Sequence, residues 1–316
     1  MLRFWKRKGE SGVVLGGVDL GPRPWLVLGG GGLKGLAHLG ALRVLKERGF
    51  EPVGILGTSI GALVGACAAA GRELEPLLEA AHALGPQDVV RIRRRAVWVK
   101  GLRSPSVFRG DSLREYLASV LPKEGWEALD IRFQANAVEL GSGETEWFGI
   151  GARTDVSLLD AVYASAALPV FYPPAELPGG LYVDGGVEYA LPIHRAAELG
   201  ATGIVAIDPG SGETTDARNV VDQGMLAVHQ RVFSIMSGRL RRASVDGWQG
   251  PPLLYLRPRL DGYGTFDFEH TAYFLEEGER AARERLGEGE EEEEVGAPRE
   301  VVAQAPSAGS STTAVP

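Results

Sequence analysis

Short apolar runs followed by helical apolar spacing dominate the first 71 residues. The run at 25–28 predicts a buried strand, and the spacing over 36–48 predicts a helix. The run at 53–56 predicts a second strand, followed by a helix of small residues over 60–70. Strands that each lead into a helix are typical of a parallel sheet covered by helices. We therefore predict an α/β fold.

Residues 72–130 are less regular than the first 71, but further elements are predicted up to residue 286. The sequence predicts a hairpin over 131–140 and 144–150, and a helix from Asp111 or Ser112 to about Val120. Further helices are predicted over 157–167, 193–199, 217–243 and 268–286, and further strands over 181–183, 204–207 and 253–256.

A glycine-rich corner follows each of the first two strands. The second corner, residues 57–61, reads Gly-Thr-Ser-Ile-Gly and places Ser59 between a strand and a helix. Gly57 and Gly61 permit the crowded turn that exposes a nucleophilic serine, and the helix N-terminus favours developing negative charge. A plain glycine turn is the alternative. The flanking strand and helix favour the nucleophile.

The first corner, residues 29–35, reads Gly-Gly-Gly-Gly-Leu-Lys-Gly. The backbone N–H groups of Gly30, Gly31 and Gly32 are candidates to bind an oxyanion, where one donor is worth ~3 kcal/mol of barrier. The glycine spacing also matches a dinucleotide fingerprint, which requires an acid at the end of the second strand. Gly57 stands there instead. A phosphate-binding P-loop is excluded because Lys34 is followed by glycine.

Asp184 is the candidate base. It follows an apolar strand and precedes Gly185 and Gly186, so we expect it at a strand end, where sites gather in parallel sheets. A Ser-Asp-His triad of the α/β-hydrolase type stays open, because three histidines lie downstream of both Ser59 and Asp184. They are His194, His229 and His270.

Together these motifs resemble the patatin-like phospholipase family. The matching segments are 30–35, 57–61 and 184–186, with 164–169 and 171–174 shortly before Asp184, and the resemblance covers roughly residues 24–209. It implies a three-layer α/β/α fold with a mostly parallel central sheet. It also implies a lipid acyl hydrolase, of phospholipase A type, that needs neither metal nor cofactor.

The same resemblance assigns roles to residues. Ser59 would attack an ester carbonyl, Asp184 would take its proton, and the amides of Gly30 to Gly32 would hold the oxyanion of an acyl-enzyme pathway. Supporting positions are Lys34, Gly57, Gly61, Gly185 and Gly186. The family often has Arg where this chain has Lys34, which we expect to cap the loop.

Composition bounds the organisation of the chain. We expect a flexible basic leader over 1–22, a catalytic domain with a helical C-terminal extension over 23–286, and a disordered acidic tail over 287–316. Seven Glu and one Arg in that tail account for most of the net charge of −8. The single Cys67, and the absence of a signal sequence or an apolar stretch of membrane-spanning length, favour a cytoplasmic protein.

A basic run over 91–103 is the candidate contact with the inner face of the membrane. It contains Arg91, Arg93, Arg94, Arg95 and Trp98. A solvated charged face is the alternative, and no motif supports nucleic-acid binding. The sequence does not indicate an oligomeric state. A nucleotide-binding oxidoreductase and a non-catalytic lipid-binding module remain the rival functions.

Overall fold

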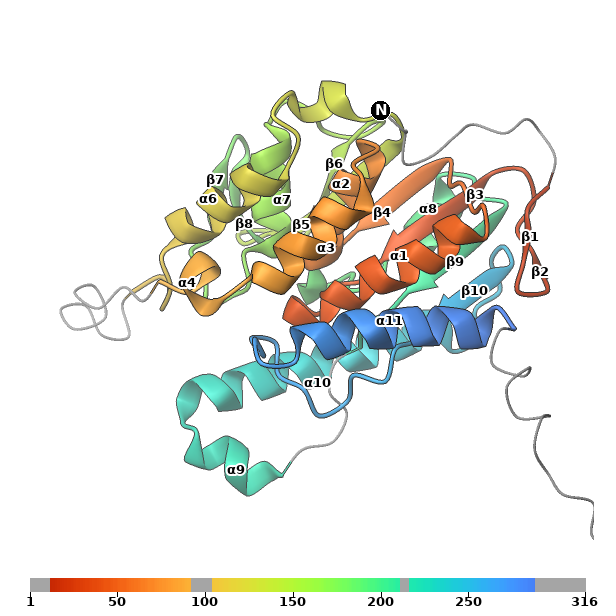
Figure 1. Cartoon of the computed structure of the whole chain (residues 1–316). Helices are drawn as coiled ribbons and strands as arrows, with labels where there is room; N and C mark the ends of the chain where they lie inside the picture. Colours follow the sequence, from red (N-terminus) through yellow and green to blue (C-terminus); the bar gives the residue numbers. More distant parts are fainter. Residues whose placement is uncertain (1–11, 92–103, 211–215, 288–316) are drawn as a thin grey trace, which may run out of the picture.

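The computed structural model describes residues 12–91, 104–210 and 216–287, which form a central sheet covered by helices (Figure 1). The strand order begins β10 (Leu253–Leu256), β9 (Gly203–Ile207), β3 (Pro24–Leu28), β4 (Gly54–Gly57), β5 (Arg132–Glu139). It ends with β8 (Gly180–Asp184) and β7 (Ala175–Leu177), while β6 (Thr145–Gly149) also pairs with β5. The first five strands are parallel, and β6, β7 and β8 run antiparallel to their neighbours.

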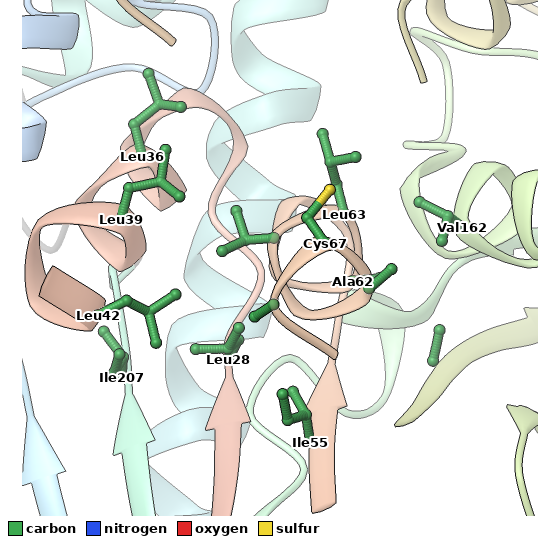
Figure 2. Close-up of a cluster of buried hydrophobic side chains, with 14 of the residues drawn as sticks. Leu28, Leu36, Leu39, Leu42, Ile55, Ala62, Leu63, Cys67, Val162 and Ile207 are labelled. Atoms are coloured by element: carbon green, nitrogen blue, oxygen red, sulfur yellow. The ribbon is translucent and has the colours of Figure 1, made fainter. Parts of the chain in front are cut away.

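Alternating side chains of β3 face two cores, which confirms the three-layer α/β/α prediction. Leu26 and Leu28 belong to the larger core, and Trp25 and Val27 to the smaller one. The larger core is covered by α1 (Ala37–Glu47), α2 (Ile60–Ala69), α7 (Leu158–Ala166) and α11 (Thr271–Arg285), and the smaller by α8 (Ile193–Glu198). Figure 2 shows Leu28 and Ile55 of the sheet beneath residues of α1 and α2.

Helices also connect β4 to β5, where the sequence pattern was weakest. They are α3 (Leu74–Ala83), α4 (Pro86–Val89) and α6 (Gly110–Val120). The prediction that Asp111 or Ser112 is the N-cap residue of α6 is wrong. Arg109 is the N-cap residue, and Asp111 accepts a hydrogen bond from the amide of Ser112 inside the first turn.

The start of the chain differs from the expected loose leader. β1 (Val14–Leu15) and β2 (Val18–Asp19) form an antiparallel hairpin. Leu15 and Leu20 are buried in the larger core, so this segment is held by apolar contacts. Two-residue strands are too short to give a periodic signal, and residues 1–11 lie outside the described part.

One of the two predicted C-terminal helices departs from the sequence pattern. The stretch expected as one helix over 217–243 is divided into α9 (Ala217–Asp222) and α10 (Met225–Val245) at Gly224, whose φ is +90°. The last helix, α11, packs tightly along α1. A Cβ on Gly40 would lie 1.9 Å from the carbonyl oxygen of Leu275, so no larger residue fits there without moving the helices apart.

The direction of β8 corrects the argument that led to Asp184. This strand is antiparallel to β5, so Asp184 does not lie at the carboxyl end of a parallel strand. The strands β4 and β8 lie end to end along the same edge of β5, because β6 overlaps both of them and must occupy the other edge. Gly57 pairs with Ala135 and Asp184 with Ala137, so the two strands end towards one another.

Candidate active site

Ser59 occupies a strained turn between β4 and α2. Its φ of 57° and ψ of −122° lie in a region that L-residues rarely adopt, at a cost of roughly 1–3 kcal/mol. The turn is tight enough to exclude side chains at both flanking glycines. A Cβ on Gly57 would lie 2.3 Å from the oxygen of Gly61, and one on Gly61 would lie 2.2 Å from the oxygen of Leu28. The serine therefore sits at a rigid corner beside the first residue of a helix.

Asp184 faces Ser59 directly. The serine Oγ donates to Asp184 Oδ2 across 2.7 Å, and Asp184 Oδ1 accepts from the amide of Gly186, also at 2.7 Å. The carboxyl group is buried, and that burial raises its pKa from 3.8 to about 6 against the lowering effect of these two hydrogen bonds and of Arg241. Asp184 is thus largely ionised at pH 7, yet more basic than an exposed aspartate.

The end of α7 fixes the backbone of both residues. The amide of Ser59 donates to the buried Ser165 Oγ at 2.9 Å, and the amide of Asp184 donates to the oxygen of Ala167 at 3.1 Å. Residues 164–169 were noticed in the sequence only as part of the family resemblance. Their hydrogen bonds give that segment a positioning role.

A buried polar network that includes Asn136 of β5 links the turn at Ser59 to the turn at Asp184. The hydroxyl of Thr58 lies 2.8 Å from both Asn136 Oδ1 and the oxygen of Tyr189. Asn136 Nδ2 donates to the oxygen of Gly185 at 3.0 Å. A Cβ on Gly185 would lie 2.4 Å from Asn136, which explains the glycine after the aspartate. Asn136 on β5 therefore links the turns at Ser59 and Asp184.

The glycine loop lies beside Ser59, but its first expected donor is already used. The amide of Gly30 donates to the oxygen of Ala190 at 2.9 Å, so it is not available to an oxyanion. Within the described part of the chain, the amides of Gly31 and Gly32 have no such partner. Gly32 has a φ of +59°, a conformation that favours glycine. The amides of Gly31 and Gly32 therefore remain as the candidate oxyanion donors.

A buried ion pair that no sequence motif indicates anchors the glycine loop. Arg241 on α10 donates to the oxygen of Gly30 and to Asp208 Oδ1, each across 2.6 Å. Asp208 is fully buried after β9 and also accepts from the hydroxyl of Tyr255 at 2.7 Å. The guanidinium group thereby connects the loop to the sheet and to α10.

Lys34 and His38 are buried next to the same loop. Burial first, and then Arg241, lower the pKa of Lys34 to about 8, so its ammonium group is mostly charged at pH 7. Burial lowers the pKa of His38 to about 4, so the imidazole is neutral. Its Nε2 donates to the oxygen of Gly29 at 2.8 Å. His38 therefore supports the loop without contacting Ser59.

A pocket with about 1000 Å³ of empty volume, its open mouth included, extends from Ser59 and Asp184. One end is bounded by the glycine loop, Lys34 and Arg241. The walls are mainly apolar, and their side chains come from α2, α4, α6, α7, α10 and nearby loops. They include Leu63, Leu84, Val89, Leu113, Leu117, Leu168, Phe233 and Phe266. The poorly patterned segment before β5 thus supplies much of this wall.

None of the five histidines lines the pocket, and all five are described. The ring of His194 packs edge-on against Trp248. His270 is exposed, and its Nδ1 lies 2.8 Å from Asp267 Oδ1. His229 belongs to α10, away from the hydrogen bonds of Ser59 and Asp184. The arrangement therefore offers Asp184, and no histidine, as the partner of Ser59.

Most of the expected membrane-contacting run lies outside the described residues, including Arg93, Arg94, Arg95 and Trp98. Arg91 is described and forms an exposed ion pair with Glu115 at 3.0 Å.

Across the described ranges, no group of His, Cys, Asp and Glu is arranged to bind a metal ion. No helix in those ranges combines the length and apolar character needed to cross a bilayer.

The chain matches a known protein family and several curated proteins. The model of the family described as patatin-like phospholipase matches residues 26–197, which include both Ser59 and Asp184. An uncharacterized NTE family protein of Mycobacterium tuberculosis is 33% identical over 198 residues, 63% of this chain and 52% of that protein.

Two longer eukaryotic proteins are also similar. Patatin-like phospholipase domain-containing protein 7 of Mus musculus is 31% identical, over 77% of this chain and 19% of that protein. A lysophospholipase, NTE1, of Coccidioides immitis is 28% identical, over 83% of this chain and 17% of that protein. The chain therefore spans about half or less of the length of these curated relatives. The match to the family model over more than half of the chain shows that it belongs to the patatin-like phospholipase family.

Proposed function

We propose that the protein is a serine acyl hydrolase that cleaves fatty-acyl esters of lipids with a Ser59–Asp184 dyad. The observation that carries this proposal is the 2.7 Å hydrogen bond between Ser59 Oγ and Asp184 Oδ2 in the lining of a mainly apolar pocket. A serine hydroxyl becomes an effective nucleophile when an adjacent base takes its proton. Asp184 is suitably placed, and its raised pKa makes it a stronger base.

In the first half of the reaction, Ser59 Oγ attacks the ester carbonyl carbon while its proton passes to Asp184. The carbonyl oxygen becomes an oxyanion that accepts hydrogen bonds from the amides of Gly31 and Gly32. The N-terminus of α2 adds favourable electrostatic potential. Collapse of the tetrahedral intermediate breaks the bond to the alcohol oxygen, which leaves with the proton from Asp184. Ser59 then carries the acyl group.

Hydrolysis of the acyl-enzyme reverses these roles. Asp184 takes a proton from water, and the hydroxide attacks the acyl carbonyl carbon. A second tetrahedral intermediate forms in the same oxyanion site. When it collapses, Asp184 returns the proton to Ser59 Oγ and the fatty acid is released.

The pocket walls support an acyl chain as the bound group. Leu84 after α3, Leu113 and Leu117 of α6, and Val89 provide an apolar surface in the pocket that contains Ser59. The lysophospholipase NTE1 relative supports a lipid substrate of this class. We propose peripheral contact with a membrane through the basic run that begins at Arg91, because a lipid hydrolase must meet its substrate at an interface.

The rival functions have less support. A dinucleotide site would need a carboxylate at the end of β4, where the Ser59 turn stands. A triad hydrolase would need a histidine within hydrogen-bond reach of Ser59, and all five lie elsewhere. A lipid-binding module without catalysis would not need the strained serine opposite a buried carboxylate.

Substitution of either dyad residue should abolish hydrolysis of p-nitrophenyl esters. We expect Ser59→Ala and Asp184→Asn each to lower kcat/KM by about 10³-fold or more, because each removes the nucleophile or its base. His229→Ala and His270→Ala serve as controls and should retain activity near that of the wild type. Activity in Asp184→Asn together with its loss in either histidine variant would show that a triad operates.

The pH dependence of kcat/KM should report the ionisation of Asp184. Because the carboxylate must be ionised to accept the serine proton, activity should rise as the pH passes upward through about 6. Initial rates with p-nitrophenyl butyrate between pH 5 and pH 8 would reveal this limb. A profile that is flat over this range would contradict the assignment of the raised pKa to the catalytic base.

Arg241 should act as a positioning residue for the glycine loop. In Arg241→Lys the ammonium group keeps a charge beside Asp208 but cannot replace both guanidinium hydrogen bonds. We expect kcat to fall about tenfold with little change in KM, because the oxyanion donors are displaced while the apolar walls are kept. Arg239→Lys, on the exposed side of the same helix, is the matched control. Equal loss of kcat in both variants, or a change in KM alone, would argue against this role.

A further inference from the structure

Exposed apolar side chains are concentrated on α9 and α10. Of the 13 large hydrophobic residues that are exposed in the described part of the chain, seven belong to these two helices. On α10 they recur at helical spacing and so share one face. The outer face of α10 is defined by Met225, Val228, Val232, Ile235, Met236 and Leu240. The other six exposed residues are spread over separate elements.

The opposite face of α10 belongs to the pocket. Phe233, Ser237 and Arg241 line the cavity that contains Ser59, and Arg241 also holds the carbonyl of Gly30. The helix therefore has one face towards the candidate active site and the other towards solvent. Anything that binds the outer face is brought within one helix diameter of the pocket, about 10 Å.

The charge of α10 is entirely positive. Its 21 residues contain Arg231, Arg239, Arg241 and Arg242 and no Asp or Glu. Arg241 is buried in the ion pair with Asp208, whereas Arg239 and Arg242 are exposed. The nearest acids along the chain, Asp222 and Asp246, lie beyond the two ends of the helix. A basic helix with an apolar stripe is typical of segments that lie in a membrane interface.

We propose that the outer face of α10 docks on an anionic lipid surface. Its apolar side chains would enter the boundary between head groups and acyl chains, and the exposed arginines would attract the negative head groups. The residues of this surface are not those of the run that begins at Arg91. The relevance of this contact to catalysis depends on the proposed function, whereas lipid binding itself does not.

A second copy of the chain fits this face less well. In a symmetric dimer built on α10, each helix would face its own copy. The exposed Arg239 of each copy would then face a helix that carries no acidic residue. An anionic bilayer supplies both the apolar phase and the opposite charge. These two requirements together favour the lipid surface.

Vesicle co-sedimentation of the full chain tests the proposal. The vesicles are phosphatidylcholine alone, or equal parts phosphatidylcholine and phosphatidylglycerol. We expect selective binding to the anionic vesicles, weakened by salt. The double variant Val232→Gln with Met236→Gln should lower the partition coefficient by about tenfold. Arg239→Gln should lower it about fivefold. Leu140→Gln is the matched control, because Leu140 and Met236 are both 56% exposed, and it should bind like the wild type.

Two further measurements separate the possible outcomes. The Val232→Gln/Met236→Gln double variant and Arg239→Gln should hydrolyse a short-chain soluble ester at the wild-type rate, which shows that they are folded. Ser59→Ala should still bind vesicles, so failure of the proposed hydrolase activity would leave the docking test intact. The proposal would be overturned if the wild-type protein does not bind anionic vesicles, or if the double variant binds them as well as the wild type does. A wild-type dimer that the double variant converts to a monomer in light scattering would also overturn it.

Discussion

The end-to-end placement of β4 and β8 against one edge of β5 is the constraint on which the site depends. One long strand pairs first with β4 and then with β8, so both shorter strands must stop where they meet. Ser59 follows the end of β4, and Asp184 is the last residue of β8. The Oγ of Ser59 and the Oδ2 of Asp184 are 2.7 Å apart. Neither side chain needs a flexible loop to reach its partner, because the register of β5 sets the distance.

The surrounding contacts keep this meeting point rigid. Ser165 and Ala167 hold the two backbones from the side of α7, and Asn136 joins the two turns from β5. The strain at Ser59 can persist because these neighbours fix the turn. The Arg241–Asp208 pair plays a similar part for the glycine loop, and it does so from α10, a helix whose outer face we propose to dock on lipid.

Sequence reasoning reached the main residues because their motifs are local. An apolar run predicts the strand before each of two motifs, Gly57 to Gly61 and Asp184 to Gly186. Both motifs could therefore be placed at the ends of the correct strands. The expected direction of β8 was wrong because a short apolar run carries no information about its pairing. The engagement of the Gly30 amide depends on Ala190, which is remote in sequence and has no motif of its own.

Long-range polar contacts were similarly hidden. Asp208 and Arg241 are 33 positions apart on different elements, and each looks unremarkable without its partner. The early hairpin was missed because its strands have two residues each. In contrast, the helices over 37–47 and 60–69 were predicted almost to the residue. The first has regular apolar spacing, the second is a run of small residues, and a glycine follows each within two residues.

The rate at which a fluorophosphonate probe labels Ser59 tests the central claim most directly, since labelling requires an activated serine but no particular lipid. Mass spectrometry of the intact protein and of its peptides would locate and time the modification. The account predicts rapid labelling of Ser59 at pH 7, slower labelling below pH 6, and loss of labelling in Asp184→Asn. Undiminished labelling in Asp184→Asn, or labelling of another serine, would contradict it.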